Sequence, residues 1–330
     1  SSSRYAEEKR VVFHKDLGPL VSAEEMSRCI HCTRCVRFGQ EIAGQMELGM
    51  LNRGEHSEIT TFVGKTVESE LSGNMIDLCP VGALTSKPFR YQARTWELAR
   101  RRSVSPHDSV GANLVVQVKL DRVLRVVPFE NEAINECWIS DRDRFSYEGL
   151  YAPDRLSSPM IKGEDGQWRE ASWQDALKAV ALGLNKVLES HGAAQIGALT
   201  TEYATLEEMS LLSRLTRALG SENIDARLRQ RDAGLDAALG GVPWLGMAIA
   251  DLDTRDRVLV VGSFLRKDHP LMAQRLRQAA KRGTQVCSID IAADDPLIKL
   301  TARSVVAPNA LAHELAQVAV ALAQLKGTDV

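Results

Sequence analysis

Four of the six cysteines have the spacing of ligands to an iron-sulfur cluster. Cys29, Cys32 and Cys35 lie in the run CIHCTRC, and Cys79 follows much later in LCPVGAL, directly before a proline. Two-residue gaps let three sulfurs from one tight loop wrap one face of a [4Fe-4S] cube, and a distant Cys-Pro closes the opposite corner. The spacing therefore predicts one [4Fe-4S] cluster held by these four thiolates.

A structural zinc site is the main alternative for these thiols. Such sites usually pair two Cys-x2-Cys knuckles, whereas here one loop supplies three cysteines and the remote segment supplies one. A disulfide framework is disfavoured, because a chain of 330 residues buries an ordinary core without covalent links. His31 lies between two of the cysteines. A role in tuning the cluster through hydrogen bonding or exposure is favoured for it over direct ligation.

Three arginines, Arg28, Arg34 and Arg37, occupy the same loop. A cube held by four thiolates carries a net charge of about minus two when it is oxidised. Nearby guanidinium groups would therefore favour the reduced form. A solvated basic face is an equally open interpretation of each arginine.

The composition is that of a globular protein, with 44% hydrophobic and 25% charged residues, and the length predicts about two domains. A formal net charge of -2 argues against nucleic acid as a partner. No apolar run reaches the roughly 18 residues that span a bilayer, and no signal peptide opens the chain. We therefore expect a soluble protein, compatible with docking on a membrane complex. Because the chain starts without methionine and ends directly after an amphipathic helix, we expect a piece of a longer protein.

Local patterns indicate the elements that position the cysteines. Ser22 with Glu25 predicts a capped helix before the cysteine loop, and VRFGQEIAG predicts a second short helix. The run EITTFVG predicts a strand, and SGNMIDLCPVGAL predicts a helix that delivers Cys79 and restarts at Pro80. Farther on, NLVVQVK and VLRVVP predict a hairpin.

From Trp168 onward, strand and helix patterns alternate. Strands are predicted at QIGALTT, VLVVG and QVCSIDI, and helices are predicted to begin at Ser172, at Thr205 and after Pro270. Gly192 is expected to end the first of these helices. This alternation predicts a parallel sheet covered on both faces.

Four stretches carry a resemblance to a known family: CIHCTRCVRFGQEIAG, RGEHSEITTFVG, SELSGNMIDLCPVGALTSKPFR and NECWISDRDRFSYEGL. They look like the large iron-sulfur subunit, designated G, of bacterial NADH:quinone oxidoreductase, respiratory complex I. The resemblance covers essentially the whole chain, with the most specific motifs before about residue 150. It implies an α/β chain with a [4Fe-4S] ferredoxin-like cluster module over residues 1–102 and a degenerate cluster segment with a β-hairpin over 103–160. A partial, doubly wound molybdopterin-oxidoreductase-like domain would follow over 161–330.

The resemblance also implies a function. Cys29, Cys32, Cys35 and Cys79 would bind one cubane in the electron relay from flavin to quinone, within a proton-translocating enzyme of the respiratory chain. The partners would be the other peripheral-arm subunits, including the flavin subunit and the downstream iron-sulfur subunits, on the cytoplasmic side of the bacterial inner membrane. No cysteine precedes Cys29, so the further [2Fe-2S] and [4Fe-4S] clusters of the family would belong to a missing N-terminal part. The chain alone is expected to show no NADH:quinone activity.

The sequence departs from the family pattern at two further sites. Some members bind another cubane through Cys-x2-Cys-x3-Cys and a fourth cysteine, but Ser105, Asp108 and Ala112 stand at three of those positions. Only Cys137 remains, so we expect no cluster there and an ordinary buried thiol at Cys137, as at Cys287 in its strand. Catalytic molybdenum enzymes place a chalcogen ligand after a Gly-x-x-Asn-Ile/Val-Asp segment, where this chain has Arg231. Arginine cannot replace that ligand, so we expect no molybdopterin and a domain kept as a scaffold.

The alternatives to an electron-transfer subunit are a molybdopterin-dependent oxidoreductase similar to formate dehydrogenase, the diaphorase part of an NAD-reducing hydrogenase, and a zinc-stabilised interaction module. The missing metal ligand disfavours the first, and the α/β region disfavours the second. No nucleophile or proton-transfer pair is readable, so no catalytic residue is assigned.

Overall fold

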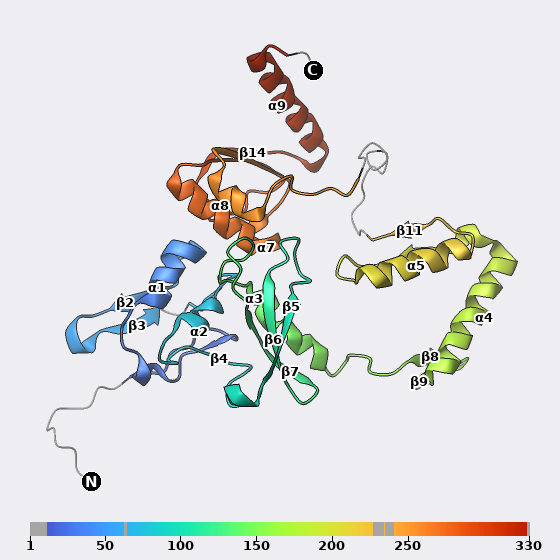
Figure 1. Cartoon of the computed structure of the whole chain (residues 1–330), viewed down its shortest axis with the longest axis horizontal. Coiled ribbons are helices and arrows are strands. Elements are labelled where there is room, and N and C mark those ends of the chain that lie inside the picture. The colour runs from blue at the N-terminus through green and yellow to red at the C-terminus, as the bar shows by residue number, and fades with distance from the viewer. Residues whose placement is uncertain (1–11, 63–64, 227–233, 235–240, 329–330) are drawn as a thin grey trace, which may run out of the picture. The chain divides into compact units, whose positions relative to one another are not determined.

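The computed structural model describes residues 12–62, 65–226, 234 and 241–328, and the chain packs into two compact units. Unit 1 combines residues 1–148 with 245–330, and unit 2 is the intervening segment 149–244 (Figure 1). Unit 1 is therefore discontinuous in sequence, because the chain returns to it after unit 2. Among the helices of the described part, none combines the length and apolar character needed to cross a bilayer.

The cysteine-bearing part of unit 1 is built from short elements around one hydrophobic core. Two antiparallel ribbons pair β1 (Val21–Ser22) with β4 (Thr85–Ser86) and β2 (Leu48–Leu51) with β3 (Glu58–Thr61). The helical elements are η1 (Met26–Arg28), α1 (Arg34–Phe38), its π-helical continuation η2 (Gly39–Ala43), η3 (Gly54–His56), α2 (Asn74–Leu78) and η4 (Thr95–Glu97). The predictions of a helix after Cys35, of a strand at EITTFVG and of a helix leading to Cys79 are confirmed.

Two local predictions in this part are wrong. Ser22 does not cap a helix, because it lies in β1 and its hydroxyl accepts a hydrogen bond from Nη1 of Arg90 at 2.7 Å. Only the single 3-10 turn η1 follows it. The chain also does not restart as a helix at Pro80: it turns at Gly82, whose φ is 65°, and the next two amides point at the sulfur of Cys79.

A three-stranded antiparallel sheet follows in the order β5-β6-β7. Its strands are β5 (Ala99–Val104), β6 (Asn113–Lys119) and β7 (Arg122–Pro128). The predicted hairpin of β6 and β7 is confirmed. Strand β5 was not predicted, since all six of its residues are exposed and the run ARRRSV shows no alternation of apolar and polar side chains. The helices α3 (Asp141–Phe145) and η5 (Ser146–Tyr151) come next.

The C-terminal part of unit 1 holds a parallel sheet in the order β12-β13-β14, which contains the predicted strands VLVVG and QVCSIDI. The predicted strand QIGALTT is not part of it, because Ala198–Leu199 pair with Ile224–Asp225 in a separate two-stranded sheet. Its strands are β12 (Arg257–Val261), β13 (Gln285–Asp290) and β14 (Leu300–Val305). The helices are η7 (Ile249–Thr254), α7 (Leu265–Asp268), α8 (Pro270–Arg282), η8 (Pro308–Ala310) and α9 (Leu311–Lys326). Helix α8 buries Ala273 and Leu276 against Val286 of β13, which forms a second hydrophobic core.

Unit 2 contains a β-hairpin and two long helices. The hairpin joins β8 (Met160–Lys162) to β9 (Trp168–Glu170), and a short parallel pair joins β10 (Ala198–Leu199) to β11 (Ile224–Asp225). The helical elements are α4 (Trp173–His191), η6 (Ala193–Gln195) and α5 (Leu206–Ala218). The helix starts predicted at Ser172 and Thr205 are confirmed, because each side chain accepts a hydrogen bond from the backbone amide three residues later.

Helix α8 and the residues just before it connect the C-terminal part of unit 1 to its cysteine-bearing part through polar contacts. Arg277 is buried and donates from Nη1 to the carbonyl of Ile42 at 2.7 Å and from Nε to the carbonyl of Leu297 at 2.8 Å. Burial lowers the pKa of Arg277 to about 10. Just before α8, Arg266 pairs with Glu70 at 3.0 Å. Two segments more than 200 residues apart are therefore joined by buried polar contacts.

The start of α2 depends on a buried amide that bridges two segments. Asn74 is 1% exposed, and its Nδ2 donates to the carbonyls of Leu71 and Ile139 at 2.9 and 2.8 Å. Its Oδ1 accepts from the amide of Ile139 and from Arg144, both at 3.2 Å. These four contacts hold α2 against the segment that leads into α3.

Asn74→Ala should lower the free energy of unfolding by about 3 kcal/mol, since it strands several buried partners of one amide. Urea denaturation followed by circular dichroism measures the loss. Asn309→Ala is the matched control, because Asn309 is exposed in η8 and its change should stay within about 0.5 kcal/mol. Equal effects of the two changes would contradict this account.

Candidate metal centre

The run CIHCTRC folds into a tight loop between η1 and α1. Cys29 ends η1, Cys35 lies in α1, and the two non-glycine residues His31 and Thr33 between them have left-handed φ values of 53° and 58°. Such values cost free energy outside glycine and persist only where the surroundings enforce them. The loop that carries the three cysteines therefore has two left-handed residues within its seven positions.

Helix α2 brings the fourth cysteine to the same part of unit 1. Cys79 is the residue at its C-terminal cap. No side chain of α2 caps its own start, but Asp141 reaches it from a distant segment: the Ser72 hydroxyl donates to Oδ2 at 2.5 Å and the Gly73 amide donates to Oδ1 at 2.7 Å. Burial raises the pKa of Asp141, while these hydrogen bonds act in the opposite direction. The contacts of Asp141 therefore fix the start of α2, and with it the position of Cys79 at the other end of this short helix.

Backbone amides point at two of the four sulfurs. The amide of His31 donates to Sγ of Cys29 at 3.4 Å, and the amides of Ala83 and Leu84 donate to Sγ of Cys79 at 3.2 and 3.4 Å. Hydrogen bonds to sulfur stabilise thiolates and help to set the potential of a bound cluster. The backbone amide of His31 thus acts as a hydrogen-bond donor to the predicted ligand Cys29.

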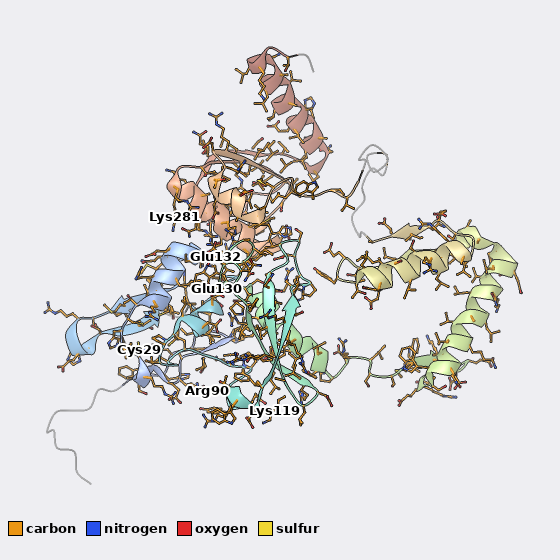
Figure 2. All side chains as sticks on the ribbon, viewed as in Figure 1. Cys29, Arg90, Lys119, Glu130, Glu132 and Lys281 are labelled. Carbon is orange, nitrogen blue, oxygen red and sulfur yellow. The ribbon has the colours of Figure 1, made fainter. Side chains whose placement is uncertain are left out.

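The two cysteine segments pack on one core. Cys29, Cys35 and Cys79 all lie against the hydrophobic cluster that includes Met26 and Met75. A Cβ atom placed on Gly82 would lie 3.8 Å from Nη1 of Arg28, so the turn after Cys79 also approaches the residue before Cys29. Figure 2 labels Cys29 in this part of unit 1. The structure therefore brings all four predicted ligands to one region.

Three of the four thiols are partly buried, and they influence one another. The pKa of Cys35 is raised to about 11, chiefly by burial and to a smaller extent by the nearby thiols of Cys29 and Cys32. Cys29, Cys35 and Cys79 are partly buried, whereas Cys32 is exposed. Within the described ranges, no three side chains of His, Cys, Asp or Glu stand close enough to hold a metal ion. The site is thus an open group of thiols around a loop and a helix end.

The predicted basic side chains are exposed and two of them have carboxylate partners. Nε of Arg28 lies 3.6 Å from Glu25, and Nε of Arg37 lies 3.3 Å from Glu41. Arg34 is also exposed. Exposed pairs of this kind contribute little to stability. Because each carboxylate offsets part of the charge of its arginine, Arg28 and Arg37 would act less strongly on a bound cluster.

At the second group of positions, where some relatives would carry another cluster, the side chains make other contacts. The Ser105 hydroxyl donates to Asp143 at 2.5 Å in a buried contact, Ala112 is fully buried in the hydrophobic core, and Asp108 accepts from the amide of Val110. Cys137 is exposed, so the prediction of a buried thiol is wrong. It directly follows a turn closed by the bridge between Asn131 and Glu136, which leaves its side chain on the surface. Cys287 lies in β13 and is partly buried, as expected.

The amides of Ala83 and Leu84 were not predicted as parts of the site, although Gly82 in LCPVGAL is the signal for a chain that turns back toward Cys79. Arg231, which stands near the metal-ligand position of the molybdenum enzymes, lies outside the described residues.

Three family models match successive segments of the chain. The ferredoxin-like domain of NADH-quinone oxidoreductase subunit 3 matches residues 18–85, which contain all four predicted ligands. The NADH-ubiquinone oxidoreductase NDSU1/NuoG-like 4Fe-4S domain matches residues 98–148, where Cys137 is the only cysteine. The molybdopterin oxidoreductase family matches residues 155–323, about half of the chain.

Similar proteins include the NADH-quinone oxidoreductase subunit designated G from Rickettsia felis, which is 41% identical over 86% of this chain and 41% of its own length. The mitochondrial NADH dehydrogenase [ubiquinone] iron-sulfur protein 1 of Solanum tuberosum is 43% identical over 84% of this chain and 37% of its own length. Among solved structures, acetylene hydratase from Pelobacter acetylenicus gives a TM-score of 0.42 at 18% identity, covering 59% of this chain and 28% of that one.

Together these matches define a class of chain in which iron-sulfur ferredoxin-like segments precede a molybdopterin-oxidoreductase domain. Within that class, the chain belongs to the family of the large iron-sulfur subunit, designated G, of NADH-quinone oxidoreductase. It spans about two-fifths of the length of the relatives that it matches.

Proposed function

We propose that Cys29, Cys32, Cys35 and Cys79 hold one [4Fe-4S] cluster, which relays single electrons from the flavin toward quinone in NADH:quinone oxidoreductase. The observation that carries the proposal is the set of backbone amides directed at the sulfurs of Cys29 and Cys79. A cluster at this place supplies one-electron redox chemistry, because its charge is spread over four irons and their sulfides. The protein contributes the thiolates, the amides and a partly buried setting.

The donor set favours a cube over a single zinc ion. Four zinc-bound thiolates each lie about 2.3 Å from the same metal, whereas each thiolate of a cube binds a separate iron at a different corner. Here one loop supplies three thiols and the end of α2 supplies the fourth, which differs from the paired Cys-x2-Cys knuckles of structural zinc sites. The order of the ligands along the chain therefore favours the cube.

The proposal assigns the full-length protein to the peripheral arm of the enzyme. Its partners would be the flavin subunit and the downstream iron-sulfur subunits, on the cytoplasmic side of the membrane. The names of the relatives support assembly into NADH-quinone oxidoreductase. We also propose sequence domains over 1–102, 103–160 and 161–330, supported by the ranges of the three family matches. The packing units are a separate division, because the last part of the third domain returns to unit 1.

The test is iron and acid-labile sulfide analysis with low-temperature EPR on anaerobically purified protein. The proposal expects one [4Fe-4S] cluster at this site, with an EPR signal that appears on reduction. Stoichiometric zinc without sulfide would instead establish the zinc-stabilised module.

The region from Ser146 to Val330 is expected to bind neither molybdenum nor tungsten and to leave formate unoxidised. The reason is chemical: an arginine near the ligand position cannot serve as a soft chalcogen donor. Elemental analysis by mass spectrometry and a search for a released molybdopterin dinucleotide check this. Detection of the dinucleotide in denatured protein would support the molybdopterin-dependent alternative.

A further inference from the structure

A cleft of about 690 Å³ opens beside the predicted cluster site, entirely within unit 1. Its walls come from the loop of Arg28, from α2, from residues 82–97 and from β7. Arg28 directly precedes Cys29, and Gly82 lies in the turn that directs amides at Cys79. The cleft and the cysteine site therefore share a wall. Its size falls in the range of specific binding pockets.

The cleft is basic. Five arginines line it, against three carboxylates. Each carboxylate already has a cation: Asp77 pairs with Arg144 at 2.6 Å, Glu25 with Arg90 at 2.9 Å, and Glu97 with Lys119 at 2.8 Å. From outside the lining, Lys119 offsets Glu97 and Glu24 offsets Arg90, so the lining keeps an excess of arginine charge.

Two of the lining arginines, Arg94 and Arg125, form no ion pair with any described residue. Arg94 is exposed. The segment that carries it, residues 87–102, holds six lysines and arginines against one glutamate, in a chain whose net charge is -2. Of these six cations, Arg90 and Arg94 line the cleft. A concave basic surface of this kind attracts anionic groups.

Of Arg94 and Arg125, Arg125 is the more buried. Its Nε donates to Oε1 of Gln117 at 2.7 Å, and its guanidinium carbon lies 4.4 Å from the ring centroid of Phe89. Partial burial lowers the pKa of Arg125, the charge of nearby Asp77 raises it, and the positive charges of Arg144 and Arg100 lower it. Asp77 forms its ion pair with Arg144, so Arg125 has no ion pair of its own among the described residues, and partial burial of such a cation is costly. An anion brought from outside would offset that cost.

Aromatic side chains at the same place indicate the kind of anion. Tyr91, in the lining, is 86% exposed, and Trp96, between two lining residues, is 81% exposed. Figure 2 labels their neighbour Arg90. Tyrosine, tryptophan and arginine are the residues that most often dominate the energy of protein interfaces. Exposed rings of this size serve an extended partner surface, whereas a free ion would need only the arginines.

We propose that this cleft docks an acidic segment of a neighbouring protein subunit, whose carboxylates meet Arg94 and Arg125 while Tyr91 and Trp96 pack against its apolar atoms. The inference rests on the proposed electron-transfer function and adds the place and chemistry of one partner. A subunit held here lies next to the wall shared with the cluster site. The contact would therefore fix a redox partner at short range.

The first experiment is photo-crosslinking in the full-length protein within its assembled enzyme. The photoreactive residue p-benzoylphenylalanine replaces Tyr91, and the linked peptide is sequenced by mass spectrometry. The expected product is a peptide of another subunit that carries aspartate or glutamate near the linked residue. The same probe at Phe62, which is 75% exposed and outside the cleft lining, should not give that product.

The second experiment measures how tightly the partner subunit is retained. Arg94→Glu should weaken its association by about tenfold or more and make the remaining association less sensitive to salt. Arg53→Glu is the matched control, because Arg53 is exposed and does not line the cleft. Arg125→Gln, a milder change in the half-buried position, should weaken association in the same direction. In each variant, the cluster EPR signal shows that the site has remained folded.

Several outcomes would overturn the docking proposal. These are crosslinks only within the same chain, a linked peptide without carboxylates, or equal retention in Arg94→Glu and Arg53→Glu. Loss of the Tyr91 crosslink on adding millimolar inorganic phosphate or ATP, with subunit retention unchanged by Arg94→Glu, would identify a small-anion site instead. An intact cluster signal in these cases would leave the proposed function standing. A missing cluster signal in the unmodified protein would overturn the proposed function itself.

Discussion

Cys79→Ser should remove about four iron atoms per chain and abolish the EPR signal of the cluster. A serine hydroxyl is a poor ligand for iron, and the two amides directed at Sγ of Cys79 would lose their acceptor. Since ligand binding to such a site contributes to folding, thermal stability should also fall markedly. Iron and sulfide analysis, EPR and a thermal melt on anaerobic samples measure the three effects.

Cys137→Ser and Cys287→Ser are the controls, because neither cysteine belongs to the proposed ligand set. Both variants should keep the full iron content and the EPR signal, with only modest changes in stability. If Cys137→Ser lost the cluster while Cys79→Ser kept it, the ligand assignment would be wrong.

Gly44→Ala should lower the free energy of unfolding of unit 1 by about 3 to 5 kcal/mol. Gly44 has a φ of 78°, and a Cβ atom there would overlap Nε and Cδ of Arg277. The left-handed conformation alone costs about 1 to 2 kcal/mol in a non-glycine residue. Displacing Arg277 would add the loss of its buried hydrogen bonds to Ile42 and Leu297.

Gly54→Ala separates the two causes. Gly54 also has a left-handed φ, 61°, but a Cβ atom there would meet no other atom within 4 Å. Its alanine variant should therefore show only the conformational cost of about 1 to 2 kcal/mol. Urea denaturation with tryptophan fluorescence as the signal compares the two variants. Equal losses would mean that the clash with Arg277 is unimportant.

Signals within a few residues of one another predicted much of the local structure. The capping residues Ser172 and Thr205 mark helix starts that the structure confirms, because a cap depends only on the next three residues. The β-rich runs NLVVQVK and VLRVVP, joined around Asp121 and Arg122, likewise predicted the β6-β7 hairpin. The triple-cysteine loop with its remote Cys-Pro pointed to the two segments that the structure brings onto one core.

The errors lie where distant contacts decide the outcome. Ser22 has the local pattern of a cap, but its hydroxyl binds Arg90, 68 residues away. The start of α2 is capped by Asp141 rather than by a side chain of its own. The hydrogen bond from Arg277 to the carbonyl of Ile42 could not be predicted either, because the two residues are 235 positions apart. Such contacts leave no periodic trace in the sequence.

The discontinuity of unit 1 has a consequence for the order of events during synthesis. Ile42 leaves the ribosome 235 residues before Arg277, so the buried contact between them cannot form until nearly the whole described chain has emerged. At about 5 to 20 residues per second, that interval lasts roughly 10 to 50 s. During this time the cysteine loop is already made but the edge that α8 later covers is still exposed. The cysteine-bearing part of unit 1 therefore completes its packing only after α8 has been made.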